Sequence, residues 1–255
     1  MFKKILSINF LFTIVLFSLS AKSQVSLKDS SAFATLIGIS YSYQFSGADL
    51  SERYGNNSSI GLSCMLKTKN NWLFGADFNY LFGNDVKIYD QIVKNIATSD
   101  GQVISKEGVY SDIRMFERGF ISTVKIGKLF PVFNSNPNSG IVFLGSAGII
   151  QHQIRIETDN NAAPQLVGDY ARGYDRLSNG FVISQFLGYM YLSDKKLTNF
   201  FVGIEFNQGW TRSKRDYNFD TMKKDTDRKF DTLWGFKIGW VLPIYNRAPE
   251  KFYYN

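Results

Sequence analysis

The sequence predicts an all-β protein, an eight-stranded antiparallel transmembrane β-barrel. Three observations predict it: an export signal at the N-terminus, eight segments in which apolar and polar residues alternate, and connections that are alternately short and long. The 255 residues are 44% hydrophobic and 20% charged, which excludes a disordered chain. One Cys and one His exclude a disulfide scaffold and argue against a Cys/His metal site.

Residues 1–23 have the three parts of a signal peptide. Lys3 and Lys4 form the positive region, residues 5–19 are uncharged and mainly apolar, and residues 21–23 are a small-x-small cleavage site. We expect cleavage before Gln24 and export of the mature chain. Three lysines leave with the signal, so the net charge falls from +7 to +4, which is too weak and scattered to predict nucleic-acid binding.

The mature chain alternates with a period of two, as strands do when one face meets an apolar medium. The clearest example is 200–211, where the even positions are apolar except for Gln208. Residues 140–155 and 180–192 are apolar on both faces. The predicted strands are residues 32–45, 58–67, 72–82, 118–130, 140–155, 180–192, 200–211 and 234–242.

The connections differ in length in the way that outer-membrane barrels require. Three are short polar turns, at 68–71, 131–139 and 193–196, and four are long polar loops, at 46–57, 83–117, 156–179 and 213–230. Short turns and both termini are then expected in the periplasm. The predicted division is a signal peptide (1–23), a periplasmic segment (24–31), the barrel (32–243) and a periplasmic tail (244–255). Loop 83–117 is long, so we expect a short helix near 86–96 or strands that extend above the membrane.

A soluble barrel is the alternative to a membrane barrel. The polar face of the strands is mostly Gly, Ser and Asn, small enough to fill a narrow lumen, whereas a soluble barrel would carry more charges outside. Aromatic residues also gather at the strand ends, as an interfacial girdle requires. The predicted girdle comprises Trp72, Phe82, Phe130, Tyr191, Trp210, Trp234 and Trp240.

On this pattern the chain resembles the small outer-membrane barrel families, the OmpA-type membrane domains and their relatives, over residues 33–242. The ending Gly-Trp-Val-Leu-Pro-Ile-Tyr at 239–245, followed by Phe-Tyr-Tyr at 252–254, looks like that of Bacteroidota outer-membrane proteins. It departs from the common pattern in which an aromatic residue of the last strand ends the chain. Some relatives of this appearance serve in secretion or outer-membrane assembly machinery, so the resemblance implies an accessory subunit.

Few residues offer catalytic chemistry. Guessed hairpin centres allow a row of His152, Ser184 and Glu205 across three strands, which loosely resembles the Ser/His/acid sets of eight-stranded lipid A deacylases. No His-x-Ser motif exists, and the favoured interpretation of His152 is a lone histidine that is hydrogen-bonded near a barrel rim. The segment 225–227 lacks the glycine of a calcium loop, so no metal and no cofactor are expected.

Four charged residues fall on faces that we assign to the lumen: Asp77, Lys125, Glu205 and Lys237. If the hairpins centre on residues 101 and 221, Asp77 lies opposite Lys125 and Glu205 lies opposite Lys237. Two ion pairs in so narrow a space would plug the lumen, because unpaired buried charges are costly.

Partners are predicted from two surfaces. Loop 213–230 carries six Lys/Arg and four Asp, which suits lipopolysaccharide phosphates or an acidic partner. Gly145, Ala147 and Gly148 form a small-residue surface for packing against another outer-membrane protein. The leading interpretation is a non-enzymatic subunit of an outer-membrane assembly or secretion complex. A small porin or ligand channel is second, and a lipid A-modifying hydrolase that uses His152 is third.

Overall fold

The computed structural model of the protein describes residues 31–132, 136–159, 163–193 and 198–245. The predicted signal peptide and its cleavage site, the segment up to residue 30 and the tail beyond residue 245 lie outside these residues.

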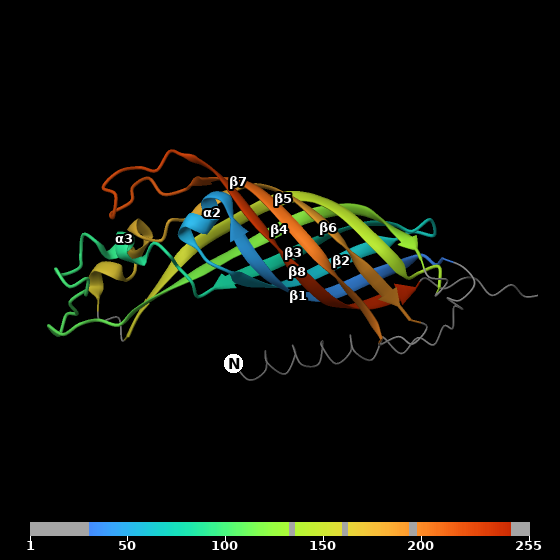
Figure 1. Cartoon of the computed structure of the whole chain (residues 1–255), viewed down its shortest axis with the longest axis horizontal. Helices are drawn as coiled ribbons and strands as arrows, with labels where there is room; N and C mark the ends of the chain where they lie inside the picture. The colour runs from blue at the N-terminus through green and yellow to red at the C-terminus, as the bar shows by residue number, and fades with distance from the viewer. Residues whose placement is uncertain (1–30, 133–135, 160–162, 194–197, 246–255) are drawn as a thin grey trace, which may run out of the picture.

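Eight antiparallel strands form one closed barrel, so the predicted fold class is confirmed (Figure 1). Each strand pairs with its neighbours in sequence, and the first pairs with the last. The strands are β1 (Ala34–Gly47), β2 (Asn57–Lys67), β3 (Trp72–Gly83), β4 (Ile113–Pro131), β5 (Gly140–Thr158), β6 (Ser178–Leu192), β7 (Asn199–Ser213) and β8 (Arg228–Tyr245).

The strands are strongly tilted. A path of paired residues that starts at Trp234 and crosses every strand returns to β8 at Ile244, ten residues further along the chain. A tilt of this kind closes eight strands into a barrel whose interior is just wide enough for side chains.

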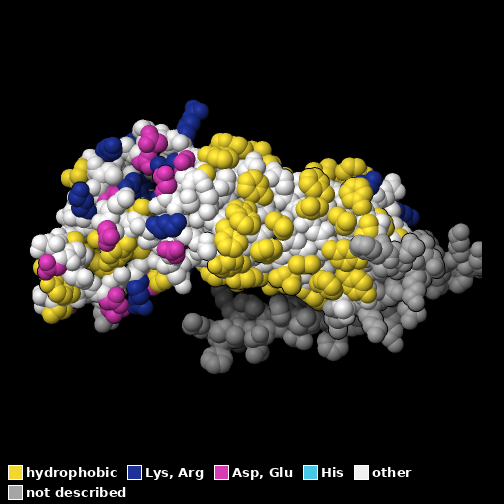
Figure 2. Space-filling model, viewed as in Figure 1, with side chains coloured by type: hydrophobic (Ala, Val, Ile, Leu, Met, Phe, Trp, Pro, Cys, Tyr) yellow, Lys and Arg dark blue, Asp and Glu magenta, His cyan; other side chains and the backbone are white. Residues whose placement is uncertain are grey.

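The outer face of the barrel is an apolar belt (Figure 2). Large apolar side chains such as Val124 and Leu62 are 68% and 62% exposed, and charged side chains gather on the loop side of the belt. A continuous apolar surface of this extent is not stable in water and requires lipid. Among the described residues no helix has the length and apolar character needed to cross a membrane.

The lumen is less polar than the sequence predicted. Its turn-side half is filled by an apolar cluster that includes Leu144, Phe186, Met190 and Phe201. These residues come largely from β5 and β6, which explains why both faces of those strands are apolar: one face meets lipid and the other fills the barrel. A second apolar cluster joins the upper lumen to the loops.

The loop end of the barrel contains structure of its own (Figure 1). The first loop forms α2 (Ala48–Arg53), the second contains α3 (Tyr89–Val93), and the third contains two 3-10 turns, η2 (Pro164–Leu166) and η3 (Tyr170–Gly173). Both expectations for the second loop are met, because it holds a short helix and β4 begins at residue 113 rather than 118.

The last strand is longer than predicted at both ends. It starts at Arg228 rather than residue 234, and Ile244 and Tyr245 still pair with Thr35 and Ala34 of β1. Strand β8 therefore continues beyond the predicted end at residue 243 to Tyr245, the last residue that the structure describes.

Candidate functional site

Four charged side chains meet in the middle of the lumen. The Lys125 ammonium lies 2.5 Å from an Asp77 carboxylate oxygen, and the Lys237 ammonium lies 2.8 Å from Glu205 and 3.6 Å from Asp77. All four side chains are less than a tenth exposed. Asp77 also accepts hydrogen bonds from the Thr123 hydroxyl (2.5 Å) and the Asn79 amide (2.8 Å). The four charges are thus joined in one network rather than two separate pairs.

The structure corrects the predicted register of these residues. Asp77 lies opposite Thr123, and Lys125 lies opposite Gly75, two residues away from the expected pairing. Likewise Glu205 lies opposite Gly235, and Lys237 lies opposite Gly203. The hairpin centres were each placed one residue too far along the chain, and the long lysine side chains span the resulting offset.

The charged network leaves almost no free volume. The cavity beside it is about 20 Å³ and is lined by the four charged residues and by apolar side chains such as Met65 and Phe186. A space of this size holds about one water molecule. The lumen thus has an apolar layer on the turn side, a charged layer in the middle and a mixed layer below the loops.

A second polar cluster closes the lumen under α2. The Arg53 guanidinium donates to Asp231 (3.0 Å) and to the Ser178 hydroxyl (3.2 Å). Asp231 is also within 3.0 Å of the His152 ring nitrogen Nε2 and accepts a hydrogen bond from Thr211 (2.5 Å). This cluster ties the short helix to the barrel wall. Sequence reasoning missed it because the predicted last strand began after Asp231.

The predicted catalytic row does not form. His152 lies opposite Ser178, whereas Ser184 lies opposite Ser146. Ser146 and His152 are six residues apart on β5, which is about 20 Å at the rise of a strand. Glu205 lies opposite Phe186 and contacts Lys237 instead. The ring nitrogen Nδ1 of His152 is buried and has no hydrogen-bond partner among the described residues. No group of metal-ligating side chains occurs in the part of the chain that the structure describes.

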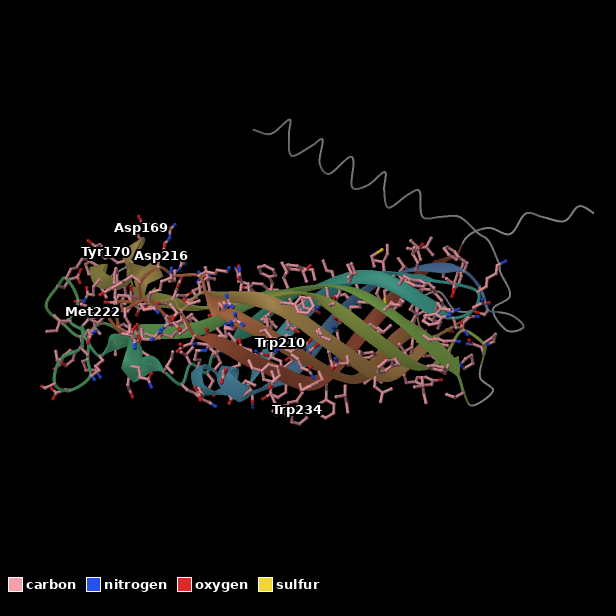
Figure 3. The ribbon with its side chains drawn as sticks, turned by 90° about the horizontal axis from the view of Figure 1, so that it is seen from above. Asp169, Tyr170, Trp210, Asp216, Met222 and Trp234 are labelled. Atoms are coloured by element: carbon pink, nitrogen blue, oxygen red, sulfur yellow. The ribbon has the colours of Figure 1, made fainter. Side chains whose placement is uncertain are left out.

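The predicted girdle residues all lie on the outer face. Trp72, Phe130, Trp210, Trp234 and Trp240 are each more than 40% exposed. Figure 3 shows Trp210 and Trp234 pointing away from the barrel near its loop end. The remaining predicted members, Phe82 and Tyr191, are half-buried.

The small-residue surface is only partly as predicted. Gly145 and Ala147 alternate with the buried Leu144 and therefore face outward, but Gly148 faces inward, because strand residues alternate in direction. Outward-facing Gln185 lies directly opposite Gly145 on β6. Its side-chain amide makes no hydrogen bond to any described residue.

The loops hold the remaining ion pairs. Partial burial of Asp225 disfavours its charge, but hydrogen bonds from the Lys229 ammonium (2.9 Å) and the Asp227 backbone N–H (3.1 Å) outweigh this effect and lower the pKa of Asp225 below its usual range. Arg215 donates two hydrogen bonds to Asp175, which raise the pKa of Arg215 despite the opposing effect of its burial. A cavity of about 580 Å³ with both acidic and basic walls opens among the loops.

The comparisons find known proteins that are similar in structure only. No protein-family model and no curated protein sequence matches the chain. Similar solved structures include the attachment invasion locus protein Ail of Yersinia pestis (9% identity, TM-score 0.44, 83% of this chain and 99% of that one) and Neisserial surface protein A (12%, 0.43, 82% and 96%). The N-terminal β-barrel domain of Pseudomonas aeruginosa OprF is another (12%, 0.37, 81% and 97%).

The identities and TM-scores are low, so the assignment rests on the chain's own strand pairing and surface. Eight antiparallel strands in a closed, tilted ring, an apolar outer belt and long loops at one end define a small β-barrel of the outer-membrane type.

Proposed function

We propose that the protein is a non-enzymatic outer-membrane barrel with a plugged lumen, and that it serves as a structural or accessory subunit of an outer-membrane assembly or secretion complex. The filled lumen carries this proposal. Apolar side chains, the charged network and the Arg53 cluster follow one another along the axis. A barrel filled in this way has no path for solutes, so its role lies on its surface.

The lipid-facing surface of β5 and β6 supports a subunit role. At Gly145 and Ala147 the outward-facing residues of the belt are small, and Gln185, opposite Gly145, faces outward with its amide donors and acceptor unused by the described residues. A polar amide in hydrocarbon is costly, and a protein partner that hydrogen bonds to it removes that cost.

The proposed topology follows from the two ends of the barrel. Ala34 and Tyr245 pair with each other at the turn end, which fits a chain whose two termini both lie in the periplasm after cleavage before Gln24. The long loops would then face the exterior, toward lipopolysaccharide.

A crosslinking experiment with a matched control tests the subunit role. A photoreactive amino acid at Ala147 should give one dominant crosslinked membrane-protein product in intact cells. The same residue at Ile39, which is 49% exposed on the opposite side of the barrel, should give only lipid adducts. Equal crosslinking from both positions, or none from Ala147, would contradict the subunit proposal.

Planar-bilayer recording tests the plugged lumen separately. The wild-type barrel should show no steady conductance. A stable open-channel current would contradict the proposal of a plugged lumen and would favour a small porin or ligand channel.

A further inference from the structure

Two rows of side chains lie one above the other on the outer face of β6, β7 and β8. The lower row is aromatic: Phe181 pairs with Trp210, and Trp210 pairs with Phe230. The next outward-facing row toward the loops is polar: Asn179 pairs with Arg212, and Arg212 pairs with Arg228.

The polar row places two positive charges directly opposite each other. Arg212 and Arg228 are both exposed, and like charges at opposed positions of an antiparallel pair destabilise a sheet. Within the described residues neither guanidinium has a carboxylate within ion-pair distance, and Asp227, next to Arg228 in the chain, does not supply one. Arg228 also lines the loop cavity that Asp225 and Asp227 share, but neither arginine is ion-paired within the described residues, so both can bind an external anion.

Other outward arginines at the loop end are already satisfied. Arg114 binds Asp159 at 2.7 Å, and Arg155 binds Glu157 at 2.8 Å. Arg118 donates to two backbone carbonyl groups. The missing partner is thus specific to the row on β7 and β8 and is not a general property of this rim.

The aromatic row sets the depth of the site in the membrane. The Trp210 ring packs against Phe181 (6.3 Å between ring centres) and Phe230 (5.5 Å). Exposed aromatic rows of barrels sit at the boundary between acyl chains and headgroups. The next residues toward the loops lie at headgroup level, where lipid phosphates lie.

We propose that Arg212 and Arg228 together bind a phosphate group of an anionic glycolipid in the outer leaflet. Guanidinium groups suit phosphate because their N–H groups donate to two oxygens at once. Asn179 offers its amide to the sugar hydroxyl or acyl-amide groups, and the acyl chains lie along Phe181 and Trp210. The proposal does not depend on the subunit role, but it rests on the proposed topology, in which the long loops face the exterior.

Binding titrations with the full-length protein in detergent test this site. The probes are a phosphorylated, acylated glucosamine disaccharide, the same glycolipid without phosphate, and inorganic phosphate. Arg212→Gln and Arg228→Gln should each weaken binding of the phosphorylated glycolipid about tenfold, the loss of one charge-assisted contact. Arg212→Lys should recover part of the affinity, and Arg155→Gln is the matched control, expected within about twofold of wild type.

Removal of the lipid phosphate should weaken binding to the wild type as much as both arginine substitutions together. Millimolar inorganic phosphate should not compete. Unchanged binding of the phosphorylated glycolipid by the variant that combines Arg212→Gln and Arg228→Gln, or an equal loss of affinity in Arg155→Gln, would contradict the proposed site. Competition by inorganic phosphate at the affinity of the glycolipid would show a free-anion site and overturn the lipid assignment. Each variant is checked for folding by its heat-dependent gel mobility.

Discussion

The charged network in the lumen predicts an unequal cost for the removal of its two carboxylates. Glu205→Gln leaves Lys237 with Asp77 at 3.6 Å and with the Asn79 side-chain amide oxygen at 3.2 Å, so one carboxylate and one amide oxygen remain for the cation. Among the described residues, Asp77→Asn removes the only carboxylate within ion-pair distance of Lys125, and it removes one of the two carboxylates near Lys237 as well.

Removal of one partner of a buried ion pair costs about 3–5 kcal/mol. Because Lys237 keeps a second carboxylate, Glu205→Gln should fall near the lower limit, about 3 kcal/mol. Asp77→Asn should reach the upper limit, about 5 kcal/mol. The double variant Glu205→Gln with Lys237→Met removes both charges of one pair, so it should cost less than the two single variants together, by about 1–3 kcal/mol.

The assay is urea unfolding of the barrel in lipid vesicles, followed by Trp fluorescence. Ser42→Ala is the control, because this buried lumen hydroxyl lies opposite Lys237 on β1 and makes no hydrogen bond. Its cost should stay below about 1 kcal/mol. Additive effects in the double variant, or equal costs for the two carboxylates, would refute a shared and dry network.

Three further predictions concern the surface, the N-terminus and the loops. Ile238→Arg should lower the free energy of unfolding by about 2–4 kcal/mol, and by more in thick bilayers. Gly239→Arg should prevent folding in any lipid, because a β-carbon at residue 239 would lie 2.4 Å from a ring carbon of Phe201 in the lumen. N-terminal sequencing of the outer-membrane fraction should start at or near Gln24, and a retained first methionine would contradict export by cleavage. Because the pKa of Asp225 is lowered in the folded protein, its ion pair with Lys229 stabilises the loop at any pH above the unfolded pKa of the carboxyl group. This stabilisation is lost as the pH falls below about 4. Amide exchange of the 225–229 segment, corrected for intrinsic rates, should rise progressively as the pH is lowered through this range, and protection that stays unchanged down to a pH of about 1 would contradict the role of the pair.

The fold was predictable because the membrane imposes a simple pattern. Lipid requires apolar residues at every second position of a strand, so the outer faces of β7 and β8 can be recognised directly from the sequence. The same rule failed at the ends of strands that rise above the lipid. There the alternation is interrupted, because Asp231 and Thr232 are both polar. The predicted start of the last strand is therefore six residues too late.

The site was less predictable because side-chain contacts depend on register. The inward direction of Asp77 and Lys125 follows from alternation alone, but their alignment depends on where a long loop turns. A shift of one residue in the turn moves the opposed pair by two, which a lysine side chain spans. The turn between β5 and β6 lies three residues from the predicted centre, so His152 and Ser184 are six residues out of register and cannot meet. Arg53 and Asp231 are 178 residues apart in the sequence, so no local sequence pattern predicts their contact.

The network in the lumen also bears on how the barrel closes in one register. The β3–β4 hairpin carries Asp77 and Lys125, and the β7–β8 hairpin on the opposite wall carries Glu205 and Lys237. Lys237 joins the two walls across the lumen through Asp77 and Asn79. Apolar packing on the turn side tolerates small slips because it has no direction, whereas a slip of either hairpin would leave a buried charge unpaired. The charges therefore select one closed state.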